Sequence, residues 1–154
     1  MSRGKDNSRP RDDAEQVLAR AGLAKTPNRA LVIRTLARSS TTLSAPELLE
    51  LVHRERPMNK VTLYRILDLL VENRVAFRHS AGDGTMRYCL GRSQSGPTHI
   101  HFYCRSCNAM ECLSRDEVDL DLAALGRAAP RQVDSVELRL DGLCAACAEQ
   151  EKGK

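Results

Sequence analysis

Cys104-Arg-Ser-Cys107 and Cys144-Ala-Ala-Cys147 decide the fold of the C-terminal half of this chain. Each pair follows an apolar, strand-like run, and together the four thiolates can hold one zinc ion in a tetrahedral structural site. The alternative is two disulfides, which form in oxidising compartments. Residues 1–11 are polar and charged, without the apolar segment of an export signal, so we expect a cytoplasmic protein with a zinc site.

Length and composition predict small cores. The chain has 154 residues, of which 42% are hydrophobic and none is Trp. It lacks an apolar run long enough to cross a membrane, so no membrane association is expected. Lys and Arg outnumber Asp and Glu as far as Tyr88, whereas acidic residues are in excess from Cys89 onward. The first half is therefore the candidate nucleic-acid-binding half, although a solvated basic surface without a partner would have the same composition.

The first half has a helical pattern after a polar arm. Residues 1–13 are expected to be a disordered basic arm, and apolar residues at helical spacing begin at Ala14. Ser44-Ala-Pro-Glu47 has the form of a capping box and begins a third helix. Asn59 is a candidate N-cap for a fourth helix over about 60–73. Two helices joined by the short segment around Pro57 indicate a helix-turn-helix.

The helices are followed by a predicted hairpin and a second domain. Segments 75–80 and 85–90 are strand-like and are joined by Ala81-Gly-Asp-Gly84, so residues 14–90 form a predicted winged-helix domain. Residues 91–97 are a Gly, Ser and Pro-containing linker, and 98–148 form a small α/β domain, followed by a tail over 149–154. In this second domain we expect strands near 100–104, 109–113 and 135–140, and a helix over about 116–125 capped by Ser114. The predicted fold class is α+β.

The fourth helix presents polar side chains suited to DNA. Its first turns expose Lys60, Thr62, Tyr64 and Arg65, which match phosphates, a thymine methyl group and purine acceptors in a major groove. Arg20, Lys25 and Arg29 are candidates for contacts to backbone phosphates. The alternative is that these are ordinary solvated side chains and that Tyr64 packs against the wing.

A second metal site is predicted around the linker. The remaining cysteines and three of the four histidines are His79, Cys89, His99, His101 and Cys112. His99 and His101 are two residues apart in a predicted strand, so their imidazoles lie on one face. Each residue alone would more simply be a buried cysteine or a polar strand residue. The group straddles the linker, so an ion bound there would fix the angle between the two domains.

The donor atoms of this second group favour zinc. Thiolates and imidazoles suit Zn²⁺ better than Fe²⁺ or Mn²⁺, and two thiolates would also be open to oxidation. A zinc hydrolase or deaminase would need a general acid/base carboxylate beside the metal. Glu111 is the candidate, but its alternation with Cys112 directs it to the opposite face of the strand. We therefore expect no enzyme and no small-molecule substrate.

A series of motifs resembles the Fur (ferric uptake regulator) family from about Ala14 to Cys147. They are Thr26-Pro-Asn-Arg29, Ser44-Ala-Pro-Glu47, Val61-Thr-Leu-Tyr-Arg65, Asp83-Gly-Thr-Met-Arg-Tyr88, His99-Ile-His-Phe-Tyr-Cys-Arg-Ser-Cys107 and Gly142-Leu-Cys-Ala-Ala-Cys147. The resemblance implies a homodimeric repressor that binds A·T-rich inverted repeats in double-stranded DNA when its regulatory metal is present. It also implies that the second domain is the dimerisation domain and that Tyr64 and Arg65 contact bases.

The resemblance also assigns the metal ligands. Cys104, Cys107, Cys144 and Cys147 match the structural zinc ligands, and Cys89, His99, His101 and Cys112 fall at regulatory positions. A cysteine at the position of Cys89 is typical of the zinc uptake regulator (Zur) branch, whereas Cys112 departs from the more usual carboxylate. His79 matches a ligand of some zinc sensors. Thr98, Ile100 and Val136 stand where many members bind a further ion, so about two zinc ions per chain are expected. A response to iron, manganese or peroxide is the alternative within the family.

Overall fold

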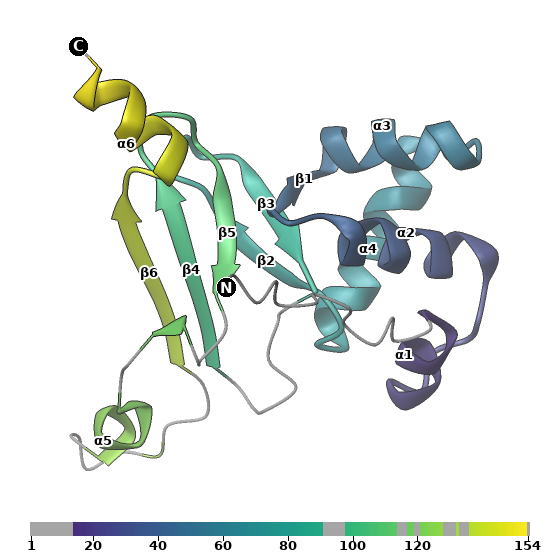
Figure 1. The fold of residues 1–154 in the computed structure, drawn as a ribbon. Helices are drawn as coiled ribbons and strands as arrows, with labels where there is room; N and C mark the ends of the chain where they lie inside the picture. The colour runs from purple at the N-terminus through teal and green to yellow at the C-terminus, as the bar shows by residue number, and fades with distance from the viewer. Residues whose placement is uncertain are drawn as a thin grey trace, which may run out of the picture.

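The computed structural model has the predicted α+β fold, with a helical half and a strand-rich half (Figure 1). It describes residues 14–90, 98–113, 117–118, 121–127, 132 and 136–153. The helices are α1 (Ala14–Arg20), α2 (Pro27–Arg38), α3 (Ala45–Glu55), α4 (Lys60–Glu72), α5 (Leu122–Arg127) and α6 (Ala145–Lys152). The strands are β1 (Leu43–Ser44), β2 (Phe77–Ser80), β3 (Met86–Cys89), β4 (Thr98–Cys104), β5 (Met110–Leu113) and β6 (Val136–Gly142). The predicted arm over 1–13 and linker over 91–97 lie outside the described residues.

Helices α3 and α4 begin at the residues that their capping motifs predict. The Ser44 hydroxyl accepts a hydrogen bond from the Glu47 amide, and the Glu47 carboxylate accepts one from the Ser44 amide at 2.7 Å, which completes the capping box. The Asn59 side chain accepts a hydrogen bond from the Thr62 amide at 2.8 Å and caps α4. Helix α3 ends at Glu55, shortly before Pro57, as the helix-turn-helix pattern predicts.

A continuous apolar core holds helices α1 to α4 together. Leu18 of α1, Leu48 of α3, and Leu63 and Leu67 of α4 are fully buried, and Leu31 of α2 joins them. Because these leucines follow the helical repeat, one face of each helix packs inward and the other remains exposed. This core positions α4 with Lys60, Tyr64 and Arg65 on the outer face.

Strands β2 and β3 form the predicted hairpin behind the helices. They pair antiparallel with Phe77 opposite Cys89, and β1 adds to the other edge of β3, giving the order β1-β3-β2. Gly84 has φ of +79° in the turn, a conformation that glycine adopts without strain. The first half is therefore a winged helix.

The second sheet has the order β5-β4-β6, with β5 antiparallel and β6 parallel to the central strand β4. The sequence predicts a helix over 116–125, whereas the described helix α5 is Leu122–Arg127 and begins after Asp121, whose carboxylate accepts from the Ala124 amide at 2.9 Å. Its predicted cap, Ser114, lies outside the described residues. The sequence also predicts a tail from residue 149, whereas α6 continues to Lys152 because no breaker interrupts its Ala and Glu-rich sequence.

The two halves contact each other through the wing. The Thr42 amide donates a hydrogen bond to the Met110 carbonyl at 2.8 Å, and Ala81, Tyr103 and Met110 form a small buried cluster. The Tyr103 ring lies so close to Gly82 that a Cβ atom there would be 2.9 Å from it. The wing therefore packs on the sheet face that carries Tyr103 and Met110. Among the described residues, no helix is both long and apolar enough to cross a membrane.

Candidate metal centres and nucleic-acid interface

The four cysteines of the two Cys-x-x-Cys pairs come together at one end of the second sheet. Cys104 ends β4, Cys107 lies in the turn before β5, Cys144 precedes α6 and Cys147 lies in its first turn. Their Sγ atoms are all within 4.8 Å of one another, and the Sγ atoms of Cys107 and Cys144 are 3.9 Å apart. Tetrahedral zinc with Zn–S bonds of about 2.3 Å requires sulfur atoms about 3.8 Å apart, so these residues fit a zinc ion.

Backbone hydrogen bonds shape this cluster. The Cys104 and Asn108 amides donate to the Ala109 and Cys104 carbonyls, and Asn108 has φ of 60° in the tight turn. The Cys144 amide donates to Cys104 Sγ at 3.3 Å. The amides of Cys107 and Cys144 lower the pKa of the Cys104 thiol to about 6. This thiol is therefore ready to bind a cation near neutral pH.

The thiols of this cluster oppose one another's ionisation. A hydrogen bond to Ser106 lowers the pKa of the Cys147 thiol, but the neighbouring Cys144, burial and the other two cysteines outweigh it and raise that pKa to about 12. The Ala109 amide lowers the pKa of Cys107, whereas the adjacent Cys104 raises it overall. Four thiolates at this separation need a positive charge among them, which a divalent cation supplies.

A second cluster joins three strands from both halves. His79 of β2, Cys89 of β3 and His101 of β4 are all buried, and their ligand atoms lie within 4.8 Å of one another. Cys89 Sγ is 3.6 Å from Nε2 of His79 and 3.6 Å from Nε2 of His101. Tetrahedral zinc with Zn–N and Zn–S bonds of about 2.1 and 2.3 Å places such atoms about 3.6 Å apart. The geometry of the three donors therefore fits one zinc ion.

The electrostatics of the second cluster favour a cation. A hydrogen bond with Cys112 lowers the pKa of the Cys89 thiol, burial opposes this, and the two histidines lower it further. Burial lowers the pKa of His79, but hydrogen bonds and charge from Cys89 and Glu137 outweigh it, so the pKa of this imidazole is raised. The thiolate and the imidazole nitrogens are therefore buried sulfur and nitrogen ligands of the kind that zinc prefers.

The structure brings four of the five predicted regulatory residues to this place. Cys112 is buried on β5, directly opposite His101 in the strand register, and interacts with Cys89. It lies outside the tight group of His79, Cys89 and His101. The backbone of His99 lies in β4 opposite Glu137, but its side chain is outside the described part of the structure.

Two carboxylates near the second cluster have different positions. Glu111 pairs with Phe102 in the register, whereas Cys112 pairs with His101, so Glu111 lies on the opposite face of the sheet, as its alternation predicts. Glu137, which sequence reasoning missed, accepts a hydrogen bond from His79 at 2.7 Å between Nδ1 and Oε1. No local motif could have found this contact, because it joins strands 58 residues apart.

The predicted DNA-contacting face of α4 is accessible. Lys60, Tyr64 and Arg65 are exposed, and the Lys60 ammonium lies 5.7 Å from the centre of the Tyr64 ring. Tyr64 keeps 37% of its surface exposed, which disfavours the alternative that it is buried against the wing. Thr62 is half-buried and Val61, beside Tyr64, is 59% exposed. The face thus combines cationic, hydroxyl and apolar groups, as major-groove readers do.

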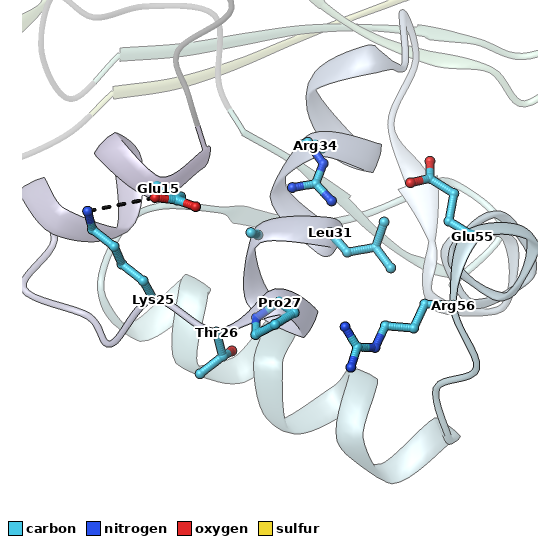
Figure 2. Close-up of a pocket in the computed structure, with 9 residues that line it drawn as sticks. Glu15, Lys25, Thr26, Pro27, Leu31, Arg34, Glu55 and Arg56 are labelled. Carbon is cyan, nitrogen blue, oxygen red and sulfur yellow. Dashed lines mark ion pairs between the residues drawn. The ribbon is translucent and has the colours of Figure 1, made fainter.

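The predicted phosphate-contacting residues lie on α1 and around the start of α2. Lys25 Nζ is 3.9 Å from Glu15, and the Arg29 guanidinium donates to the Ala24 carbonyl at 2.8 Å, so Arg29 also fixes the loop before α2. Arg20 ends α1. A hollow of about 450 Å³ is lined by Lys25, Arg34 and Arg56 and also by Glu15 and Glu55 (Figure 2). The sequence analysis did not single out Arg34 and Arg56. They become neighbours only when α2 and the end of α3 pack together.

Comparison with known proteins gives a consistent result. The model of the "Ferric uptake regulator family" matches residues 20–140. The "Zinc uptake regulation protein" of Escherichia coli (strain K12) is 34% identical over 145 residues, which cover 90% of this chain and 81% of that protein. The "Ferric uptake regulation protein" of Bacillus subtilis (strain 168) is 29% identical over 128 residues, covering 82% of this chain and 86% of that protein.

A solved structure supports the same relationship. The structure of a "Zinc Uptake Regulator Complexed With Zinc AND DNA" superposes with a TM-score of 0.65 at 29% identity, covering 90% of this chain and 93% of that chain. The likeness therefore extends over both halves, including the strands that carry the two clusters.

Proposed function

The chain belongs to the ferric uptake regulator family, and we propose that it acts there as a zinc-responsive transcriptional repressor. Members of this family are regulators of transcription, not enzymes. The observation that carries the proposal is the buried cluster of His79, Cys89 and His101, in which a thiolate and two imidazoles converge between the halves of the chain. Zinc prefers such ligands, whereas iron(II) and manganese(II) prefer sites richer in carboxylates.

Two zinc ions per chain follow from the two clusters. Cys104, Cys107, Cys144 and Cys147 would hold a structural ion, which stabilises the fold without an open coordination position. His79, Cys89 and His101 would hold the regulatory ion. His99 and Cys112 are the candidates to complete its coordination, since both lie on strands that border the cluster.

The regulatory ion would act by selecting one arrangement of the two halves. We take residues 14–90 as the DNA-binding domain, 91–97 as the hinge and 98–148 as the dimerisation domain. Because the cluster takes ligands from β2 and β3 of the first domain and β4 of the second, an ion bound there favours the arrangement in which these strands are close. A coupling of about 1–3 kcal/mol would tighten operator binding roughly 5- to 150-fold.

The DNA would be an A·T-rich inverted repeat contacted by two copies of α4. Lys60, Thr62, Tyr64 and Arg65 would contact the major groove, while Arg20, Lys25 and Arg29 would contact phosphates. Half-sites on one face of the duplex require a homodimer. The face of the second sheet away from the wing carries Phe102, Leu138 and the 39% exposed Leu140, and this apolar surface suits pairing of two such sheets. We propose that the protein carries out this role in the cytoplasm.

The alternative is a regulator of the same family that responds to iron, manganese or peroxide. The 29% identity to a ferric uptake regulation protein supports this alternative. Fluorescence anisotropy separates the two possibilities when the protein is titrated into a labelled DNA duplex taken from the region upstream of its own gene. We expect binding to tighten as buffered free zinc rises through the picomolar to nanomolar range, with no comparable response to iron or manganese. Binding indifferent to zinc would overturn the proposal.

A further inference from the structure

Glu137 contacts the regulatory cluster from a strand that contributes no ligand to it. Its Oε1 atom accepts a hydrogen bond from Nδ1 of His79 at 2.7 Å. Glu137 belongs to β6 and His79 to β2, so the contact joins the second sheet to the wing. The side chain of His79 is only 6% exposed, whereas that of Glu137 is 65% exposed. The carboxylate thus lies at the rim and the imidazole points inward.

The two nitrogens of His79 have different partners. Nδ1 faces the Glu137 carboxylate at 2.7 Å, and Nε2 faces Cys89 Sγ at 3.6 Å. A carboxylate is a hydrogen-bond acceptor, so Nδ1 keeps its proton, and Nε2 is the nitrogen that gives up its proton to offer a lone pair beside Cys89. This tautomer is the one that a metal ion bound beside Cys89 requires.

Strand register explains why Glu137 reaches this place. Glu137 is the partner of His99 in the parallel pairing of β4 with β6, and His99 is two residues before His101. Neighbours in register share a face, so Glu137 lies on the same face of the sheet as His101. The nearest cation on its own strand, Arg139, is held by Asp141 at 2.7 Å. Arg139 therefore pairs with Asp141, and the Glu137 carboxylate forms its hydrogen bond with His79.

We propose that Glu137 is the positioning residue of the regulatory zinc site: its carboxylate holds His79 so that Nε2 faces the metal, and it ties β6 to the wing. The proposal rests on the proposed function, because it assumes that His79, Cys89 and His101 bind zinc. Such outer carboxylates fix the ring, raise the basicity of the ligand nitrogen and contribute about 10- to 100-fold to metal affinity.

The test measures the zinc affinity of the full-length protein with Glu137→Val, Glu137→Gln and, as a matched control on the same strand, Asp141→Asn. A chromophoric chelator competes for the second zinc ion while the structural ion stays bound. We expect Glu137→Val to weaken the second site about 10- to 100-fold. Glu137→Gln keeps an oxygen that can accept from Nδ1, so it should weaken the site less, and Asp141→Asn should leave it unchanged.

Two further readouts distinguish positioning from other roles. In the cobalt(II)-substituted protein, the visible spectrum should keep the intensity of a tetrahedral site in all variants, because Glu137 supplies no ligand atom. The melting temperature of the protein without regulatory metal should fall only slightly, because Glu137 is 65% exposed and water can replace it as the acceptor of the Nδ1 proton. A purely structural role would instead lower this temperature substantially and leave the zinc affinity intact.

The outcomes separate this proposal from the proposed function. If the wild type binds one zinc ion only, the regulatory site itself is wrong. If it binds two and Glu137→Val binds the second as tightly as the wild type does, positioning by Glu137 is overturned while the sensor remains. If Glu137→Gln loses as much affinity as Glu137→Val and the cobalt spectrum changes, Glu137 is a ligand and the positioning role is also overturned.

Discussion

The two cysteine-containing clusters differ in the parts of the chain that build them. The cluster of Cys104, Cys107, Cys144 and Cys147 lies within the second half, where β4 and β6 end side by side (Figure 1). The cluster of His79, Cys89 and His101 takes strands from both halves. Its ligands are buried, whereas Cys107 of the first cluster is exposed. The first cluster is therefore built within one half of the chain, whereas the second needs residues from both halves.

The apolar cores show why the second half needs the first cluster. The buried core of the helical half extends over α1 to α4 and the wing, whereas the described residues of the second half contribute fewer buried apolar side chains, among them Ile100, Tyr103 and Met110. A unit with so little buried apolar surface gains most of its stability from a bound metal. In our proposal, zinc in the four-cysteine cluster compensates for this small core, whereas zinc in the second cluster favours one arrangement of the two halves.

Loss of the four-cysteine site should have the largest effect. We expect Cys104→Ser to unfold residues 98–153 and leave 14–90 folded, because structural zinc contributes an apparent ~10–16 kcal/mol to small metal-dependent folds. Limited proteolysis read by mass spectrometry would show cleavage confined to the second half. Cys89→Ser is the matched control, since it removes one thiol from the other cluster. Simultaneous loss of both halves in Cys104→Ser would contradict the separation into two units.

A cavity in the helical core should have the next largest effect on stability, and this effect should be confined to the first half of the chain. Leu67 is fully buried in α4, so Leu67→Ala should lower the free energy of unfolding of the first half by about 2–5 kcal/mol. Urea denaturation followed by the helical circular dichroism signal measures it. Val61→Ala, on the exposed face of the same helix, should change stability by less than about 0.5 kcal/mol. Equal losses in the two variants would show that α4 does not pack as described.

Replacement in the second cluster should change DNA binding and leave the fold intact. We expect Cys89→Ser to abolish the roughly 5- to 150-fold tightening of DNA binding by zinc. Cys89 Sγ lies 3.6 Å from Nε2 of both histidines, so its loss removes the central ligand of the cluster. Anisotropy with and without buffered zinc measures the loss, and circular dichroism checks the fold. The basal, zinc-independent affinity should persist and fall with salt as phosphate contacts weaken. If Cys89→Ser kept the zinc response, the regulatory zinc site would have to lie outside this cluster.

The same contrast governs what the sequence could predict. Helix starts at Ser44 and Asn59, the wing and the four-cysteine group follow from local motifs, because capping boxes and Cys-x-x-Cys pairs act over a few residues. The sequence predicts a group of five residues, His79, Cys89, His99, His101 and Cys112, but not which of them converge. It also does not predict the contact with Glu137, which depends on the β4–β6 register. Helix α5 begins after Asp121, whose carboxylate accepts a hydrogen bond from the Ala124 amide, and this local cap was not predicted.

The contact that holds the wing to α3 should give the smallest effect, and a pH-dependent one. Glu47 accepts from the Ser44 amide at 2.7 Å and pairs with Arg87 of β3 at 3.3 Å. Partial burial raises the pKa of this carboxyl, but the hydrogen bonds from Ser44 and the charge of Arg87 outweigh it and lower the pKa below the usual 4.5. A lowered pKa in the folded state means that the stabilisation is present above pH 4.5 and is lost as pH falls through the folded value.

We therefore expect Glu47→Gln to destabilise the helical half by about 0.2–1 kcal/mol at pH 7, the range of exposed ion pairs. The difference from the wild type should shrink as pH falls from about 5 towards 3, because the wild-type carboxylate is then protonated. Urea midpoints across this pH range measure it, with Glu50→Gln, whose partner is Arg54 on the same helix, as control. Arg87 lies two residues before Cys89 on the same strand, so the zinc response of the Glu47→Gln variant should also be measured. If the variant loses stability at pH 7 but keeps the full zinc response, the contact stabilises the wing independently of the second cluster. If the variant loses both stability and the zinc response, the Glu47–Arg87 contact also orients the second cluster.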